Sequence, residues 1–202
     1  KVLTNFAKLL IDSDFDNPLI VTWDLELHKR DQVLLKDNDN YVDVFEFSKL
    51  NGIELMQVEN INDENVITSL RNRNINVIFS ISSRWIFKKN LLNAFKGLAL
   101  NIHPGYLPRE RGSTVYPKIL NNVKTAGVTI HLIVPAIDAG PILLKKQENI
   151  EVETLTIDLL TKINIQISEK LLKIFLERII NRIEIKETSQ EAEKGLMILS
   201  KN

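Results

Sequence analysis

The 202-residue sequence predicts an α/β fold built on a mostly parallel sheet, and two observations point to this class. Short apolar runs alternate along the chain with segments of helical period, which is the pattern of right-handed strand–helix–strand crossovers. The continuous apolar run 77–81 is typical of a strand buried on both faces of a parallel sheet. A chain of this length buries about 70% of the surface it exposes when unfolded, so it needs no metal or disulfide to form a core.

The N-terminal half of the chain is expected to contain four helices and four strands. Helical spacing of apolar residues predicts helices at 2–10, 41–50, 63–73 and 88–95. Apolar runs predict strands at 19–23, 53–58, 77–81 and 98–102. Asn51-Gly52 is expected to end the second helix and Asn62 to cap the third, while the polar stretch 24–40 is expected to form a loop.

The rest of the chain predicts a short helix at 115–120, strands at 128–134 and 142–147, and a long amphipathic helix at 157–180 followed by a tail. We therefore divide the chain into a core, residues 1–150, and a C-terminal helix and tail packed on it, residues 151–202. The wide apolar face of the long helix is explained mainly by packing on the sheet. Any apolar surface left over predicts a homodimer contact.

The sequence opens inside a helix, although a sheet of this type ordinarily opens with a strand whose following turn often binds phosphate. We therefore expect a first strand and its turn to be missing from this sequence. The missing segment is also expected to contribute to a ligand site.

Composition excludes several classes of protein. Lys and Arg together equal Asp and Glu at 26 each, so the formal net charge is zero, which argues against a general electrostatic affinity for nucleic acid. Cysteine is absent, which excludes disulfides, thiol nucleophiles and cysteine-ligated zinc. No apolar run is long enough to span a membrane and no signal peptide is visible, so a cytoplasmic protein is expected.

Asn101 and His103 lie two residues apart at the end of the apolar strand 98–102, where Pro104 and Gly105 stop it. Their side chains therefore share one face of the strand. Ligands of open α/β sheets bind outside the carboxyl ends of the strands. An amide and an imidazole at that position can polarise a carbonyl and move a proton. A lone histidine there is more often structural, but the pairing with Asn101 favours a site.

Asp138 follows the strand 128–134 and precedes Ala-Gly-Pro. Taken alone, it is best interpreted as a turn residue. The alternative is a carboxylate that orients His103 and raises its pKa.

Together these segments resemble the folate-dependent formyltransferases. The motifs that carry the resemblance are Asn-x-His-Pro-Gly-x-Leu-Pro at 101–108, Arg-Gly at 111–112, Gly-Val-Thr-Ile-His at 127–131 and Asp-Ala-Gly-Pro-Ile at 138–142. The resemblance extends over residues 2–150 and is most specific over 98–146. It implies the Rossmann-like formyltransferase fold, with residues 1–150 as the catalytic core.

The resemblance also implies a reaction in which a primary amine attacks the formyl carbon of 10-formyltetrahydrofolate, and a tetrahedral intermediate collapses to an amide and tetrahydrofolate. Asn101 is implied to donate a hydrogen bond to the developing oxyanion. His103 is implied to share that role or to relay protons. Asp138 is implied to set the charge state of His103 and to assist removal of the amine proton. No metal is required.

The pterin of the formyl donor is implied to lie against the backbone of two loops, which match residues 84–87 and 134–138. The cofactor-binding residues implied in this way are Arg84, Trp85, Ile86, Phe87, Val134 and Ile137. Core packing explains the side chains of Trp85 and Phe87 equally well. His131, in its Thr-Ile-His pattern, is expected to give structural support.

The acceptor amine is less strongly indicated. Arg109 and Arg111 either contact a substrate phosphate or form a solvated charge cluster. The His-Pro-Gly variant and the Arg-Gly after Leu-Pro resemble the sugar-nucleotide enzymes, so the amino group of a nucleotide-linked deoxysugar is the expected acceptor. Glycinamide ribonucleotide is the alternative. Zero net charge and the short C-terminal region argue against methionyl-tRNA.

A function of another class also stays open. The chain is alternatively a folate- or nucleotide-binding module of the same fold without activity. The presence of Asn101, His103 and Asp138 together argues against that alternative, because an inactive copy has no use for all three groups.

Overall fold

The computed structural model describes residues 1–13, 15, 18–23, 38–39, 41–151, 153 and 155–190, and the backbone of 196–198. Of the loop expected at 24–40, only Asn38 and Asp39 are described. The helices are α1 (Val2–Asp12), α3 (Val44–Asn51), α4 (Glu64–Asn72), α5 (Lys89–Ala94), α6 (Val115–Leu120) and α7 (Ile157–Ile180). The strands are β1 (Ile20–Thr22), β2 (Leu55–Gln57), β3 (Ile78–Ile81), β4 (Ala99–His103), β5 (Glu110–Gly112), β6 (Thr125–Leu132), β7 (Ile142–Asn149) and β8 (Leu196–Ile198).

The strands form a four-stranded sheet in the order β3-β4-β6-β7 and two pairs, β1-β2 and β5-β8. The pairings β1-β2 and β3-β4 are parallel, as expected, and β5-β8 is parallel too, whereas β4-β6 and β6-β7 are antiparallel. The elements expected from hydrophobic periodicity are all present, to within a few residues at their ends. The three-residue strands β5 and β8 were not predicted.

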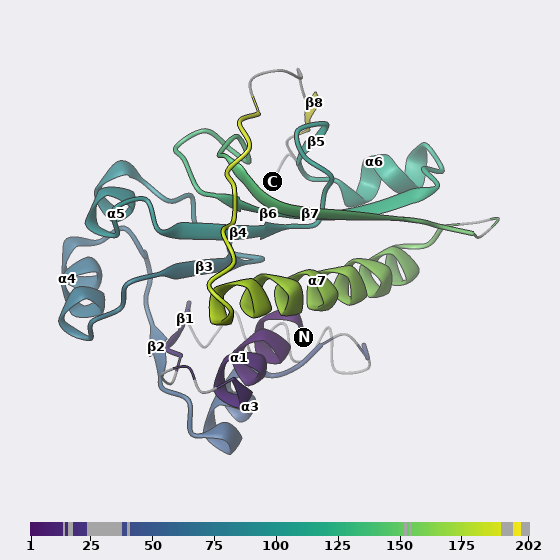
Figure 1. The fold of residues 1–202 in the computed structure, drawn as a ribbon. Coiled ribbons are helices and arrows are strands. Elements are labelled where there is room, and N and C mark those ends of the chain that lie inside the picture. Colours follow the sequence, from purple (N-terminus) through teal and green to yellow (C-terminus); the bar gives the residue numbers. More distant parts are fainter. Residues whose placement is uncertain are drawn as a thin grey trace.

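Helix α7 lies along β6 and β7 on one side of the sheet, with α1 beyond it, while α4 and α5 lie at the far end beside β3 (Figure 1). Its buried residues Leu160, Ile167 and Leu171 pack in one cluster with Val128 and Ile130 of β6. This packing explains most of the apolar face of the helix, as predicted. The homodimer stays a prediction. No helix in the described part of the chain is long and apolar enough to cross a membrane.

Strand β3 packs on both of its faces, in agreement with its continuous apolar sequence. Phe79 and Ile81 contact the cluster beneath α7, whereas Ile78 contacts the cluster formed with α4 and α5. Burial is nevertheless incomplete, because Ser80 is the one residue of the strand that is buried and Val77 just before the strand is 42% exposed. Among the residues that the structure describes, β3 lies at the edge of its sheet, which leaves part of the strand uncovered.

Among the described residues, β1 pairs only with β2 and β3 only with β4. A largely apolar cavity of about 190 Å³ is lined by residues of both β1 and β3. The additional strand expected from the sequence stays a prediction.

Asn62 does not cap α4, contrary to the prediction. The N-cap residue is Asp63, and the helix receives no hydrogen bond from a capping side chain. The Asn62 side chain instead bonds the segment before α5, where it accepts from Lys88 N at 2.7 Å and donates to Ile86 O at 3.0 Å. Gly52 ends α3 as expected, in the left-handed conformation with a φ of 64°.

Candidate active site

Four polar side chains converge beyond the end of β4. Asn101 and His103 come from β4, His131 comes from the adjacent strand β6, and Asp138 comes from the loop that joins β6 to β7. Asn101 and His131 are direct partners in the antiparallel β4-β6 register, which places the amide beside the imidazole. The structure therefore brings together the three predicted catalytic residues and adds His131 to them.

The Asp138 carboxylate contacts all of the other three. Its Oδ2 accepts a hydrogen bond from Gly112 N at 2.9 Å and lies 3.5 Å from His103 Nδ1. Its Oδ1 accepts from Asn101 Nδ2 at 3.3 Å and lies 3.5 Å from His131 Nε2. Asp138 is thus more than a turn residue, although it occupies a turn and has a positive φ of 49°. That conformation is unfavourable for a residue with a side chain and needs such contacts to hold it.

The hydrogen bonds of His103 define which of its nitrogens is basic. His103 Nε2 lies 2.5 Å from the carbonyl oxygen of Glu110, and a carbonyl can only accept, so Nε2 carries the proton. In the neutral imidazole, Nδ1 then has the lone pair, and it faces the Asp138 carboxylate. A proton taken up at Nδ1 is stabilised at once by the carboxylate.

His131 is held in the opposite tautomer. Its Nδ1 lies 2.8 Å from the carbonyl oxygen of Leu132 and donates to it, which leaves Nε2 as an acceptor in the neutral ring. Asn101 Nδ2 lies 3.2 Å from this Nε2. The two hydrogens of the Asn101 amide are therefore directed at His131 and Asp138. The contact of His131 with the site was not predicted, although its strand position opposite Asn101 carried that information.

Burial and the neighbouring groups oppose each other at both His103 and Asp138, and the net effect lowers the pKa of each. Burial lowers the pKa of His103 below its ordinary value, and the nearby Asp138 charge and the Glu110 carbonyl only partly oppose this. The expectation that Asp138 raises the pKa of His103 is confirmed for the contribution of Asp138, but burial has the larger effect and reverses the net direction. Burial raises the pKa of Asp138, but the neighbouring His131 side chain, the charge that His103 carries when protonated and the hydrogen bond from Gly112 N together bring it below its ordinary value. At neutral pH the pair is a neutral imidazole and an ionised carboxylate.

Gly105 is required by the close approach of the chain to His103. A side-chain carbon at this position would overlap His103 Nε2 and would lie 2.5 Å from the Glu110 carbonyl oxygen. Any larger residue must push apart the two groups whose hydrogen bond fixes the imidazole. The Pro-Gly that ends the strand therefore also leaves room for the histidine.

A cavity of about 330 Å³ opens beside these residues. Asn101, His103, His131 and Asp138 line it on one side. All six residues predicted to bind the cofactor line it as well: Arg84, Trp85, Ile86, Phe87, Val134 and Ile137.

The walls of the cavity are partly apolar and accessible. Ile86 is 65% exposed and Ile137 is 38% exposed. Phe87 is buried in the core cluster that includes α4 and α5, in agreement with the alternative that its side chain packs in the core. The Trp85 indole donates to Glu59 O, and its ring contacts Trp23 edge to face. The Asn62 side chain holds the 86–88 segment of this wall through its hydrogen bonds to Ile86 O and Lys88 N. Apolar walls with a few polar groups are typical of pockets that bind small organic ligands.

The two arginines predicted to contact substrate do not line this cavity. Both line a neighbouring cavity of about 170 Å³ beside α6. Arg109 lies over the Tyr106 ring, and Arg111 hydrogen-bonds Gln190 Oε1 through Nε at 3.2 Å and a terminal nitrogen at 2.9 Å. The substrate contacts of both stay predictions. Within the described residues, no group of three His, Asp or Glu side chains is arranged to hold a metal ion.

An amide, a neutral imidazole and an ionised carboxylate beside an apolar-walled cavity can orient a carbonyl compound and accept a proton from an attacking nucleophile. This arrangement defines an acyl-transfer class of site on an α/β sheet. The family model named formyl transferase matches residues 23–179, and the chain belongs to this family.

Relatives and solved structures agree with this assignment. The methionyl-tRNA formyltransferase of Thermotoga neapolitana is 35% identical over 131 residues, which cover 64% of this chain and 42% of that protein. That of Fusobacterium nucleatum is 27% identical over 153 residues, covering 75% and 49%. The chain thus spans less than half the length of these two relatives.

Solved structures share the fold at lower identity. Phosphoribosylglycinamide formyltransferase from Bacillus halodurans gives a TM-score of 0.72 with 22% identity, covering 91% of both chains. WlaRD, a sugar 3N-formyl transferase solved in the presence of dTDP and 5-N-formyl-THF, also gives 0.72, with 21% identity over 98% of this chain and 66% of that one.

Proposed function

We propose that the chain transfers the formyl group of 10-formyltetrahydrofolate to a primary amine, with Asn101, His103 and Asp138 at the reacting atoms. The observation that carries the proposal is their mutual contact at the edge of the 330 Å³ cavity. A binding module without activity requires the cavity but not this contact.

The residues around the cavity fit the donor. Ile86, Val134 and Ile137 offer apolar contacts for a pterin, and the loops that carry them offer backbone groups for its polar edge. When bound, the donor supplies an activated formyl group. A related solved structure was obtained with 5-N-formyl-THF, a compound of the same class.

Proton transfer is assigned to His103 with Asp138. A primary amine loses a proton when it forms an amide, and the neutral His103 has its free lone pair at Nδ1. The resulting imidazolium donates to Asp138 through Nδ1 and to the Glu110 carbonyl through Nε2, so both of its protons are bonded. Asp138 therefore acts by stabilising the charged form of the base.

Asn101 can donate a hydrogen bond to the oxyanion only after a small rearrangement of its side chain. Both amide hydrogens point to partners, His131 at 3.2 Å and Asp138 at 3.3 Å. Donation to a developing oxyanion requires Asn101 to give up one of them. The Asp138 contact is the weaker geometry and loses part of its strength when the carboxylate pairs with protonated His103.

Two acceptors are supported by separate observations. The nucleotide-linked amino sugar expected from the sequence is supported by Arg111-Gly112 after Leu-Pro and by the sugar 3N-formyl transferase among the solved relatives. Methionyl-tRNA is supported by the curated relatives named for it, at 35% identity in one case. A cytoplasmic location stays a prediction under either acceptor.

The test is to incubate the full-length protein with 10-formyltetrahydrofolate and, in separate reactions, methionyl-tRNA, amino-sugar nucleotides and glycinamide ribonucleotide. Mass spectrometry then reports which amine gains one formyl group. Formylation of one acceptor, abolished by His103→Ala, supports the proposal and identifies the substrate class. Folate binding without transfer to any of these amines would favour the inactive binding module.

A further inference from the structure

Gln190 is a buried polar residue of the C-terminal tail, and no local sequence pattern marks it. It is only 7% exposed, and its amide uses both donors and both lone pairs of its oxygen. Nε2 donates to Asp138 O at 3.1 Å and to Gly140 O at 2.5 Å, while Oε1 accepts the two bonds from Arg111. A buried amide with every group satisfied holds its neighbours in one arrangement.

Asp138 is therefore connected to β5 through both its side chain and its main chain. Its carboxylate accepts from Gly112 N, and its main-chain carbonyl is joined through Gln190 to the adjacent residue, Arg111. The backbone of Asp138 has a φ of 49°, an unfavourable conformation. The Gln190 hydrogen bonds to Asp138 O and Gly140 O hold the turn in that conformation.

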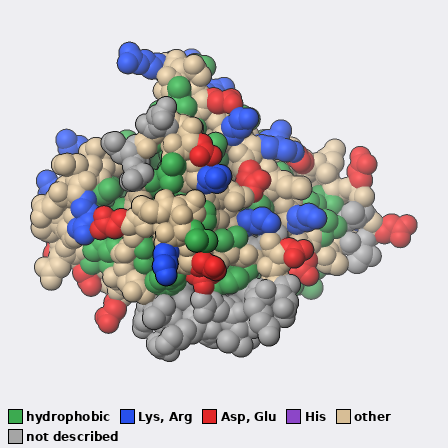
Figure 2. Space-filling model, turned by 90° about the horizontal axis from the view of Figure 1, so that it is seen from below, with side chains coloured by type: hydrophobic (Ala, Val, Ile, Leu, Met, Phe, Trp, Pro, Cys, Tyr) green, Lys and Arg blue, Asp and Glu red, His purple; other side chains and the backbone are tan. Residues whose placement is uncertain are grey.

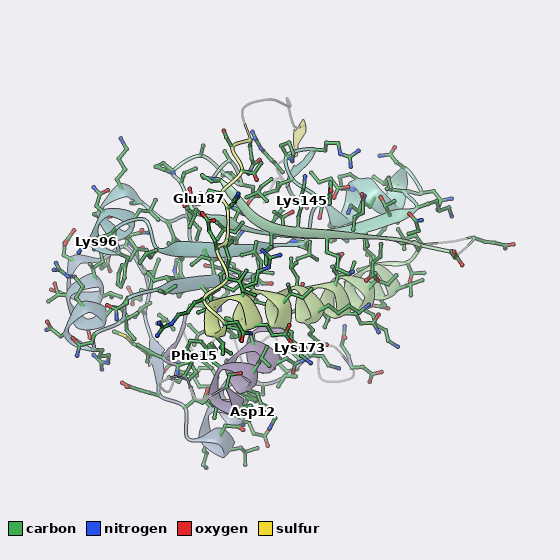
Figure 3. All side chains as sticks on the ribbon, viewed as in Figure 1. Asp12, Phe15, Lys96, Lys145, Lys173 and Glu187 are labelled. Atoms are coloured by element: carbon green, nitrogen blue, oxygen red, sulfur yellow. The ribbon has the colours of Figure 1, made fainter. Side chains whose placement is uncertain are left out.

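The tail that carries Gln190 is itself fixed to the sheet. It leaves the end of α7, carries Glu187 past the sheet (Figures 1 and 3), pairs with β7 and reaches Arg111 of β5. Thr188 and Ile142 exchange two backbone hydrogen bonds of 2.8 Å, two residues before Gln190. The position of the Gln190 amide is therefore set by backbone pairing.

We propose that Gln190 is a positioning residue for the formyl transfer, and that it acts by holding the Asp138 carboxylate against His103. The residues assigned to the C-terminal region, 151–202, thereby complete the active site of the core. Arg111 fixes the orientation of the Gln190 amide. The kinetic tests of this proposal depend on the proposed formyl transfer, whereas the contact between Asp138 and His103 can be tested without it.

The first experiment compares Gln190→Ala with Gln147→Ala, a control that removes a half-buried glutamine of β7 outside the site. We expect Gln190→Ala to lower kcat about 10- to 100-fold with little change in the KM of the formyl donor. Gln147→Ala should retain full activity. Circular dichroism establishes that both variants fold.

The second experiment separates positioning from general structural support. In an Asp138→Asn background, Gln190→Ala should lower kcat no further than about twofold, because the residue through which it acts is already altered. An equal loss in both backgrounds would overturn the proposal. Arg111→Ala should reproduce part of the Gln190→Ala loss.

A third readout does not depend on turnover. NMR titration of the His103 imidazole should show a lower pKa in Gln190→Ala, because Asp138 no longer lies close enough to raise it. The other charged and titratable groups facing His103, His131 and Glu110, are unchanged by this substitution. An unchanged His103 titration would overturn the proposal. If the wild type transfers no formyl group but the pKa of His103 is lower in Gln190→Ala, only the proposed function is contradicted, and the positioning role of Gln190 still holds.

Discussion

Asp138→Asn is the substitution that most directly tests the chemistry assigned to the site. The change removes a charge and keeps the shape of the side chain. His103 Nδ1 lies 3.5 Å from the carboxylate, and the two side chains are only 6% and 12% exposed. Two unit charges at this distance attract by about 5 kcal/mol at an effective dielectric constant near 20, which is an upper bound. Each 1.36 kcal/mol corresponds to a factor of ten in rate, so we expect kcat to fall about a thousandfold.

The assay is the initial rate of amide formation with saturating formyl donor, compared with Asp158→Asn, which removes an exposed carboxylate from the first turn of α7. The control should retain full activity. Asp138→Asn should still fold, because an amide oxygen can accept the hydrogen bond from Gly112 N. A rate within tenfold of the wild type for Asp138→Asn would refute the role given to the carboxylate.

Three further predictions concern the ring, the glycine beside it and the wall of the cavity. Because burial lowers the pKa of His103 from 6.5 and the base must be neutral, kcat/KM should stay constant at neutral pH and fall as the pH drops through that lowered pKa; an acid limb centred above pH 7 would contradict this. Gly105→Ala should lower kcat at least 100-fold, while Gly52→Ala, at a site with no neighbour within 4 Å, should affect stability by about 1 kcal/mol and leave the rate unchanged. Asn62→Ala should raise the KM of the donor several-fold at nearly constant kcat, because the 86–88 segment loses two hydrogen bonds; equal KM values would argue against its role.

The predictable part of the site came from short-range rules. The period of two along β4 placed Asn101 and His103 on one face, and Pro104-Gly105 indicated where the strand ends. Both side chains line the cavity. The loops at 84–87 and 134–138 were predicted from the resemblance, and they form its walls.

What the sequence did not predict depends on contacts between distant segments. Gln190 reaches Asp138 and Arg111 across 52 and 79 residues, and no local pattern marks it. The same is true of Asn62, whose position before a helix favoured a cap, although its amide bonds a segment 24 to 26 residues away. Strand β5 has only three residues, too few for an alternating pattern to show. The net pKa direction of His103 depends on its burial, which spacing alone does not give.

The surface provides little further guidance on the acceptor. On the face seen in Figure 2, Lys and Arg side chains are interspersed with Asp and Glu side chains, in line with the zero net charge of the chain. Neither sign is concentrated there. A phosphate-rich acceptor would therefore have to be recognised elsewhere, and the arginine-lined cavity beside α6 is one described place with suitable side chains.

We propose that the cavity binds the formyl donor and that His103 is needed for transfer and not for binding. The most direct measurement titrates the wild type and His103→Ala with 10-formyltetrahydrofolate, follows the fluorescence of Trp23 and Trp85, and records formyl transfer in parallel. We predict dissociation constants within about threefold of each other and a loss of transfer of at least 100-fold. Transfer at a comparable rate in His103→Ala would contradict the assigned chemistry, and loss of donor binding in that variant would contradict the separation of binding from catalysis.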